Sequence, residues 1–172
     1  MKTVAVFLSI GLASGLLFVN LYTSLVDAPS WGSNLPDSIA TARAYYKTVN
    51  PGTFFRLFSP LNQLLGLLVL ILFWRASPAI RWSLGIAFLL YVLGDVFTFA
   101  YFYPRNAILF HTAPLTDVGL LRKTWSEWTA MNWLRSLLLL AGLSCSVWAL
   151  HKIYLSTWPK RKVSTPHPLV SR

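Results

Sequence analysis

The chain has 172 residues, of which 55% are hydrophobic and 12% are charged, against about 25% charged residues in soluble domains. With a mean hydropathy of +0.55, this composition excludes an ordinary soluble protein and indicates one domain that lies mostly in a bilayer. The net charge of +10 does not indicate nucleic-acid binding, because most basic residues stand singly at the ends of apolar runs, where they orient membrane helices.

The first apolar run covers residues 4–25, follows Lys2, and is long enough to cross a hydrocarbon core that needs about 20 residues. No small-x-small cleavage site follows it, so we interpret it as a retained first span and not as a cleaved signal peptide. Gly11 and Gly15 are four residues apart and would let a neighbouring helix approach closely.

The chain is then expected to leave the membrane over residues 27–60, where Pro, Gly and Asn residues predict a loop. A short helix is predicted over about 37–48, ended by the Asn-Pro-Gly sequence at 50–52. Its mixture of aromatic and basic residues suits the membrane surface. The segment is explained equally well as an interfacial connector and as a lid over a site.

Three further apolar runs predict membrane spans at about 56–74, 82–103 and 130–154. The stretch 104–130 is expected to form a second long loop, with a helix within 117–129. Short connections make neighbouring helices antiparallel. Residues 1–155 are therefore predicted to form one all-α, antiparallel four-helix membrane bundle, and 156–172 a disordered basic tail.

Four spans place both termini on one side of the membrane. Lys and Arg number eight on that side and six on the other, which favours cytoplasmic termini in the cell membrane. In an antiparallel bundle, the end of the first span, the start of the second, the end of the third and the start of the fourth meet at one face. Those ends carry the polar residues of the spans: Asn20 and Thr23, Asn62 and Gln63, Asp95 through Asn106, and Asn132 with Arg135. We expect one polar site at this face.

Asp95 is the most unusual of these residues, because a carboxylate at a helix centre costs about 2.5–3.5 kcal/mol even on lenient insertion scales. We predict that it pairs with Arg135, which also begins inside an apolar run and needs an acceptor. The alternative is that such a pair only fixes the register of the helices. Two helical stripes carry the candidate site: Tyr91, Asp95, Thr98, Phe102 and Arg105 on the third span, and Trp128, Asn132 and Arg135 on the fourth.

The sequence has no nucleophile–base pair, phosphate loop, dinucleotide fingerprint or metal-ligand spacing. Its three histidines, His111, His151 and His167, are isolated, and its one cysteine, Cys145, excludes an intramolecular disulfide. No metal and no other cofactor is therefore expected. A pocket of amides, tyrosines, one acid and one or two arginines would suit a flat phenolic or quinone-like molecule, with Arg stabilising an enolate or phenolate.

Three short motifs stand at corresponding places in the spans: Ser59-Pro60-Leu61-Asn62, Tyr103-Pro104-Arg105-Asn106 and Trp128-x-x-x-Asn132-x-x-Arg135. With them, the chain from Gly11 to Tyr154 resembles the anthrone oxygenase-like proteins, small four-span membrane proteins also described as a domain of unknown function. The resemblance implies oxidation of anthrones to anthraquinones without a metal or flavin, as assigned to some fungal members, whereas most bacterial members have no assigned activity. It implies roles for Asn62, Asn106, Asn132 and Arg135, while Asp95 comes from the residues alone.

Three functions stay open from the sequence. The chain is a cofactor-independent oxygenase-like enzyme for a lipophilic aromatic, a binding or transport protein for a small hydrophobic molecule, or a structural membrane subunit. For the enzyme we assign Arg135, Asn132 and Asp95 as catalytic. The substrate would be bound by Asn62, Tyr91, Thr98, Tyr103, Arg105, Asn106 and Trp128. Expected partners are membrane lipid and a lipophilic aromatic, with homo-oligomerisation left open and no nucleic acid.

Overall fold

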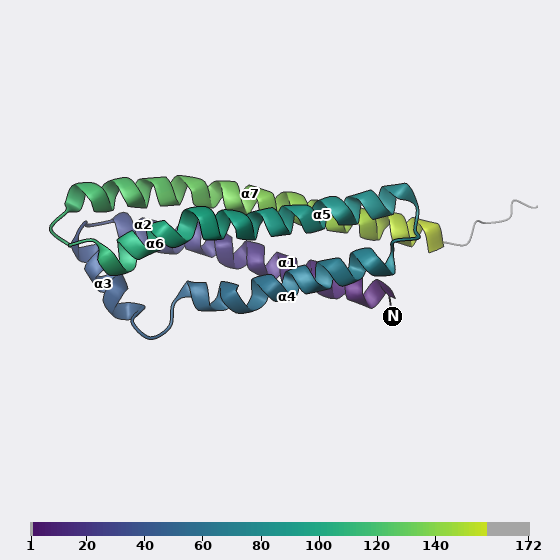
Figure 1. Cartoon of the computed structure of the whole chain (residues 1–172), viewed down its shortest axis with the longest axis horizontal. Helices are drawn as coiled ribbons and strands as arrows, with labels where there is room; N and C mark the ends of the chain where they lie inside the picture. The colour runs from purple at the N-terminus through teal and green to yellow at the C-terminus, as the bar shows by residue number, and fades with distance from the viewer. Residues whose placement is uncertain (1, 158–172) are drawn as a thin grey trace, which may run out of the picture.

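The protein folds as an elongated bundle in which four helical segments run side by side (Figure 1). The computed structural model describes residues 2–157, so nearly all of the tail predicted for 156–172 lies outside the described residues. Within this range every regular element is helical. Both ends of the described chain lie at one end of the bundle, opposite the end that holds the long connections (Figure 1). This arrangement confirms the predicted all-α, antiparallel four-helix bundle.

The first helical segment is longer than the predicted span. Helix α1 (Lys2–Tyr22) continues through a π turn (η1, Thr23–Asp27) into α2 (Ala28–Gly32). The loop predicted from residue 27 therefore begins only after Gly32. The reason is that Pro29 lies in the first turn of α2, where a missing backbone N–H is tolerated. The short helix α3 (Asp37–Tyr45) lies within the predicted range.

Proline also starts the second long helix. Helix α4 (Pro51–Leu72) begins with Pro51 in its first turn, after Asn50 in an extended conformation. We expected the Asn-Pro-Gly sequence to end a helix, and it does separate α3 from α4. The same sequence begins the second span several residues before the predicted start at 56.

The third segment passes through the predicted end of its span. Helix α5 (Pro78–Phe97) continues through a π turn (η2, Thr98–Phe102), α6 (Tyr103–Ala107) and a second π turn (η3, Ile108–Thr112). The expectation that a loop begins at Pro104 is wrong, because this proline again lies in a first helical turn, that of α6.

Helix α7 (Val118–Thr157) is a single 40-residue helix. It joins the helix predicted within 117–129 to the predicted fourth span without a break. The second loop is thereby reduced to the few residues between Thr112 and Val118. As a result, the first turns of α7 stand beside α2 and η3 and form one wall of the polar end of the bundle.

Four segments are long and apolar enough to cross a membrane: Lys2–Gly32, Pro51–Leu72, Pro78–Thr112 and Val118–Thr157. Many of their large apolar side chains point outward, among them Phe18 and Leu57. An apolar outer surface on helices of this length suits contact with lipid. The fold therefore fits a multi-pass membrane protein.

The interior of the polar end is aromatic. Trp31, Phe102 and Trp128 are buried there and pack edge to face, with ring centroids 5.1 Å apart for Trp31 and Trp128 and 5.3 Å for Phe102 and Trp128. Edge-to-face packing is a favourable arrangement of aromatic rings. These contacts join α2 and η2 to α7 and hold the connecting segments against the long helices.

Candidate functional site

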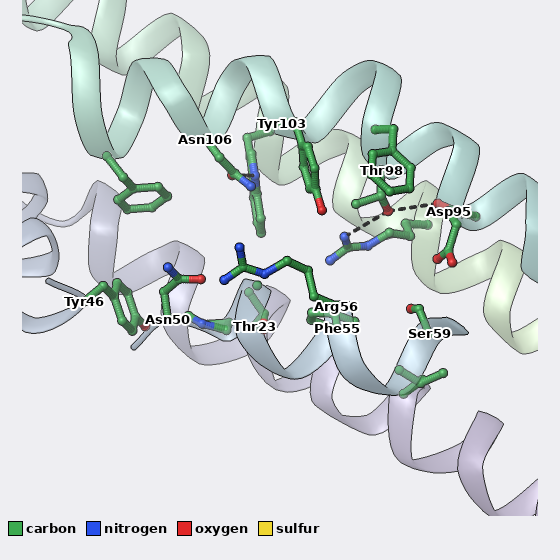
Figure 2. Close-up of a pocket in the computed structure, with 18 of the residues that line it drawn as sticks. Thr23, Tyr46, Asn50, Phe55, Arg56, Ser59, Asp95, Thr98, Tyr103 and Asn106 are labelled. Atoms are coloured by element: carbon green, nitrogen blue, oxygen red, sulfur yellow. Dashed lines mark hydrogen bonds between the residues drawn. The ribbon is translucent and has the colours of Figure 1, made fainter. Parts of the chain in front are cut away.

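A cavity of about 460 Å³ lies at the polar end of the bundle, between α4 and the segments that face it. All four long segments and the α3–α4 connection contribute to its walls. The close-up in Figure 2 labels lining residues from the first three segments and from this connection. Two π turns help to shape it, because Thr23 of η1 and Thr98 of η2 both face the cavity. A π turn holds one extra residue and thus changes the direction of the side chains that follow it.

Arg135 is the buried cation of this cavity. Its side chain comes from α7, and the residue is only 7% exposed. Its Nε donates a hydrogen bond of 2.7 Å to Asn20 Oδ1, and Nη1 donates a longer one of 3.5 Å to Thr98 Oγ1. The rings of Phe102 and Phe55 flank its guanidinium carbon at 4.5 and 5.0 Å. Its hydrogen-bond acceptors are thus neutral, and among residues 2–157 no carboxylate lies within salt-bridge distance of it.

The predicted ion pair between Asp95 and Arg135 is therefore wrong. Asp95 does line the cavity, but its Oδ2 accepts a hydrogen bond from Gln63 Nε2 of α4. The two charged groups thus belong to one cavity but are each held by a neutral amide. The pairing was expected because a charge in a span needs a partner, and amides from the neighbouring helices satisfy that need.

Asn132 lies behind the cavity and not in its wall. It is fully buried, and its Nδ2 donates hydrogen bonds to Ser24 Oγ at 2.6 Å and to the Asn20 carbonyl at 3.4 Å. Asn20 in turn donates to Ser136 Oγ at 2.7 Å. This α1–α7 network holds Asn20 where it accepts from Arg135. Asn132 thus contacts Asn20, the partner of Arg135, and does not face the cavity, where we expected it as a catalytic residue.

Four further predicted residues line the cavity: Thr98, Tyr103, Asn106 and Trp128. Asn106 accepts a hydrogen bond of 2.8 Å from Trp128 Nε1, which joins α6 to α7. Tyr103 is 41% exposed, and Figure 2 shows its ring beside the cavity, between Asn106 and Thr98. The Tyr-Pro-Arg-Asn sequence thus places its first and last residues at the site.

The other three predicted residues lie outside the cavity wall. Tyr91 is buried deeper in the bundle, where its hydroxyl lies 3.1 Å from Ser146 Oγ. Arg105 forms an ion pair of 2.8 Å with Glu127 and stacks on the ring of Tyr101. Asn62 is 2% exposed, and its Oδ1 has no hydrogen-bond partner within residues 2–157. None of these three side chains, which we expected to bind the substrate, lines the cavity.

The structure adds residues from the first connection that the sequence analysis left out. Arg43, Tyr46, Lys47 and Asn50 all line the cavity, as do Phe55, Arg56 and Ser59 of α4. Arg43 holds this connection in place, because it donates hydrogen bonds to the carbonyls of Leu109, Ile108 and Ala113 at 2.8, 3.3 and 3.0 Å. The segment therefore covers part of the site, which is the arrangement of a lid. In the sequence, the mixture of basic and aromatic residues at 43–47 is the feature that indicates such a segment.

Tyr46 is the residue of this connection whose pKa is shifted by its surroundings. Its ring packs edge to face against Trp31 and Phe110, with centroids 6.2 Å away from each. Burial, followed by the negative charge of Asp27, raises the pKa of the Tyr46 hydroxyl to about 12. Tyr46 therefore keeps its proton at neutral pH and offers a neutral hydroxyl at the cavity wall.

These groups favour binding of a flat, partly anionic molecule. The walls are rich in aromatic rings, and the buried guanidinium supplies fixed positive charge. Within residues 2–157, no group of three or more His, Cys, Asp or Glu side chains is placed to hold a metal ion. The chemistry that these side chains offer directly is hydrogen bonding, stabilisation of an oxyanion by Arg135, and proton transfer at Asp95.

Comparison with known proteins identifies the family of this chain. The family model for anthrone oxygenase matches residues 52–145, which is more than half of the chain. The match covers α5, α6, all but the first residue of α4, and the cavity-lining residues of α7. No curated protein and no solved structure matches the chain. The family match covers the sequence motifs around Asn62, Asn106 and Arg135, and on this basis the chain belongs to the anthrone oxygenase family.

Proposed function

We propose that this protein is a cofactor-independent oxygenase that oxidises an activated methylene group of a lipophilic aromatic, of the anthrone type, to a ketone. The observation that carries the proposal is Arg135. It is a buried cation in the wall of an aromatic cavity, and neutral acceptors orient it. A guanidinium in this state is ready to stabilise a negative charge that appears on a bound ligand.

The chemistry starts with loss of a proton. An anthrone carries a methylene group opposite its ketone, and removal of one methylene proton places negative charge on the ketone oxygen. We assign Asp95 as the group that accepts this proton and Arg135 as the group that binds the resulting enolate oxygen. Gln63, which donates to Asp95, orients its carboxylate.

The electron-rich enolate then reacts with molecular oxygen. One electron passes from the enolate to O₂, and the two radicals join at the former methylene carbon as a peroxide, which takes the proton back from Asp95. Loss of water from this hydroperoxide removes the second hydrogen of that carbon and leaves a carbonyl. In total, the methylene compound and O₂ give the diketone and one water. The aromatic walls and the covering connection limit the contact of the reacting atoms with bulk water.

Turnover in the purified full-length protein tests the proposal. Anthrone in detergent is mixed with the protein, and oxygen consumption and quinone absorbance are compared with the rate without protein. We expect acceleration by the wild type and a loss of about 100-fold in Arg135→Gln, the size found when an oxyanion-binding donor is removed. Arg75→Gln, at the opposite end of the bundle, is the matched control and should keep full activity. No acceleration by the folded wild type, or full activity in a folded Arg135→Gln protein, would overturn the proposal.

A further inference from the structure

The cavity carries more positive charge than oxyanion stabilisation needs. Four Lys and Arg residues line it, namely Arg43, Lys47, Arg56 and Arg135, against Asp95 as the one Asp or Glu among its lining residues. The protein has only five Asp and Glu residues in total, so cations exceed acids throughout the chain. The question is which of the four cations are free to bind a ligand.

Arg43 is occupied by the protein itself, and Arg135 is the cation assigned to the enolate oxygen. Arg43 donates to three backbone carbonyls between Ile108 and Ala113 and so serves to hold the connection. Arg135 is fixed by Asn20 and Thr98 in the buried part of the cavity. Neither of these residues accounts for the positive charge at the mouth.

Arg56 and Lys47 form the second, unoccupied cationic site. Arg56 makes one hydrogen bond, of 3.2 Å, to Thr53 one helical turn earlier, and Figure 2 shows its side chain directed from α4 into the cavity. Within residues 2–157 neither Arg56 nor Lys47 has an acidic partner, and Lys47 makes no hydrogen bond through its side chain. By contrast, the nearby Arg105 is neutralised by Glu127.

We propose that Arg56, assisted by Lys47, binds a carboxylate substituent on the aromatic substrate, so that the preferred substrate is an acidic anthrone. The inference rests on the proposed function and names the chemical class of its substrate. A planar guanidinium matches a carboxylate with two parallel hydrogen bonds. Arg135 at the buried end and Arg56 at the mouth then bind the two ends of one flat molecule.

The shape of the cavity favours this ligand over a phospholipid headgroup. Its volume of about 460 Å³ lies in the range of about 300–1,000 Å³ that is typical of small-molecule sites. The space between the two cations is walled by rings, including Phe55, Phe99 and Phe110, which suit a rigid fused-ring system. A lipid phosphate would use Arg56 and Lys47 without filling this aromatic interior.

Binding of two air-stable product analogues tests the inference. Anthraquinone-2-carboxylate and its neutral carboxamide are titrated against the full-length protein in detergent, with quenching of tryptophan fluorescence as the signal. We expect the wild type to bind the carboxylate about tenfold more tightly, as one charge-assisted hydrogen-bonded pair provides. Arg56→Gln should lose this preference while its Kd for the carboxamide stays the same. Lys47→Gln should reduce the preference, and Arg122→Gln, a cation of α7 outside the cavity, should keep it.

Several outcomes would overturn the inference. They are equal affinity of the wild type for both compounds, no binding of either, or an unchanged preference in Arg56→Gln. Displacement of the carboxylate by phosphatidylglycerol, but not by a neutral lipid, would identify a headgroup site instead. The proposed oxygenase can fail separately: a carboxylate preference without oxygen consumption supports the binding site alone. Turnover of neutral anthrone without that preference supports the oxygenase alone.

Discussion

The hydrogen bond between Asn20 and Arg135 is expected to be the strongest single link between α1 and α7. Its length is 2.7 Å and its donor is charged, and a hydrogen bond to a charged group contributes about 1.5–3 kcal/mol. Asn20 also donates to Ser136, and polar contacts between membrane helices average about 0.6 kcal/mol. Asn20→Ala should therefore lower the free energy of unfolding by about 2–4 kcal/mol.

A double-mutant cycle isolates the link. Asn20→Ala and Arg135→Met are made singly and together, and unfolding in mixed detergent micelles is followed by tryptophan fluorescence. The two changes should show a coupling energy of about 1.5–3 kcal/mol. The matched cycle with Asp95→Asn and Arg135→Met should give a clearly smaller coupling, because these two side chains form no ion pair. Additivity within about 0.5 kcal/mol for the Asn20 cycle, or the larger coupling for Asp95, would refute the assignment of partners.

Three further predictions concern packing, the covering connection and pH. Gly142→Ala should destabilise the fold by about 1–3 kcal/mol in the same unfolding assay, because its Cβ would lie 2.6 Å from the Tyr91 ring, whereas Gly85→Ala meets no atom within 4 Å and should be tolerated. Arg43→Gln should speed hydrogen exchange of the α3–α4 connection and weaken ligand binding, since it removes hydrogen bonds to three carbonyls; unchanged exchange would contradict this. The pKa of Tyr46 is raised to about 12, so its contribution to the free energy of unfolding should be present below pH 10 and be lost as the pH rises toward 12. The ionisation of Tyr46 is measured as the difference in absorbance at 295 nm between the wild type and Tyr46→Phe during a pH titration. A midpoint near pH 10 would refute the prediction.

The sequence predicted the arrangement of the helices better than their ends. Apolar runs of spanning length set the four segments, and the polar ends of these runs indicated which face would hold the site. The ends were misplaced at Pro29 and Pro104, which were interpreted as loop residues. Each proline lies in the first turn of a helix that follows directly on a π turn. Whether a proline ends a helix or begins the next one depends on the turns before it, which residue type alone does not specify.

The sequence analysis predicted the charged residues in the buried part of the candidate site but missed those at its mouth. Arg135 and Asp95 were found because charges within a span are costly and therefore conspicuous. Arg56 and Lys47 were missed because basic residues near a membrane surface are common, and only the folded positions of α4 and of the α3–α4 connection bring them to the cavity. Arg105 was wrongly expected to line the site, because its ion-pair partner Glu127 lies 22 residues away in sequence and the pair could not be recognised there.

In the proposed oxygenase, the separation of Asp95 from Arg135 leaves both charged groups able to act on a ligand. A direct ion pair would satisfy both charges, and each would then have to be released before it could bind anything else. Here Gln63 orients the carboxylate and Asn20 orients the guanidinium, and a neutral amide fixes the direction of a charged group without cancelling its charge. Both charges remain available to the cavity, where little reorganisation is needed when charge develops on a bound molecule. The amides come from α4 and α1, so the packing of these two helices against α5 and α7 sets the geometry of the two charges.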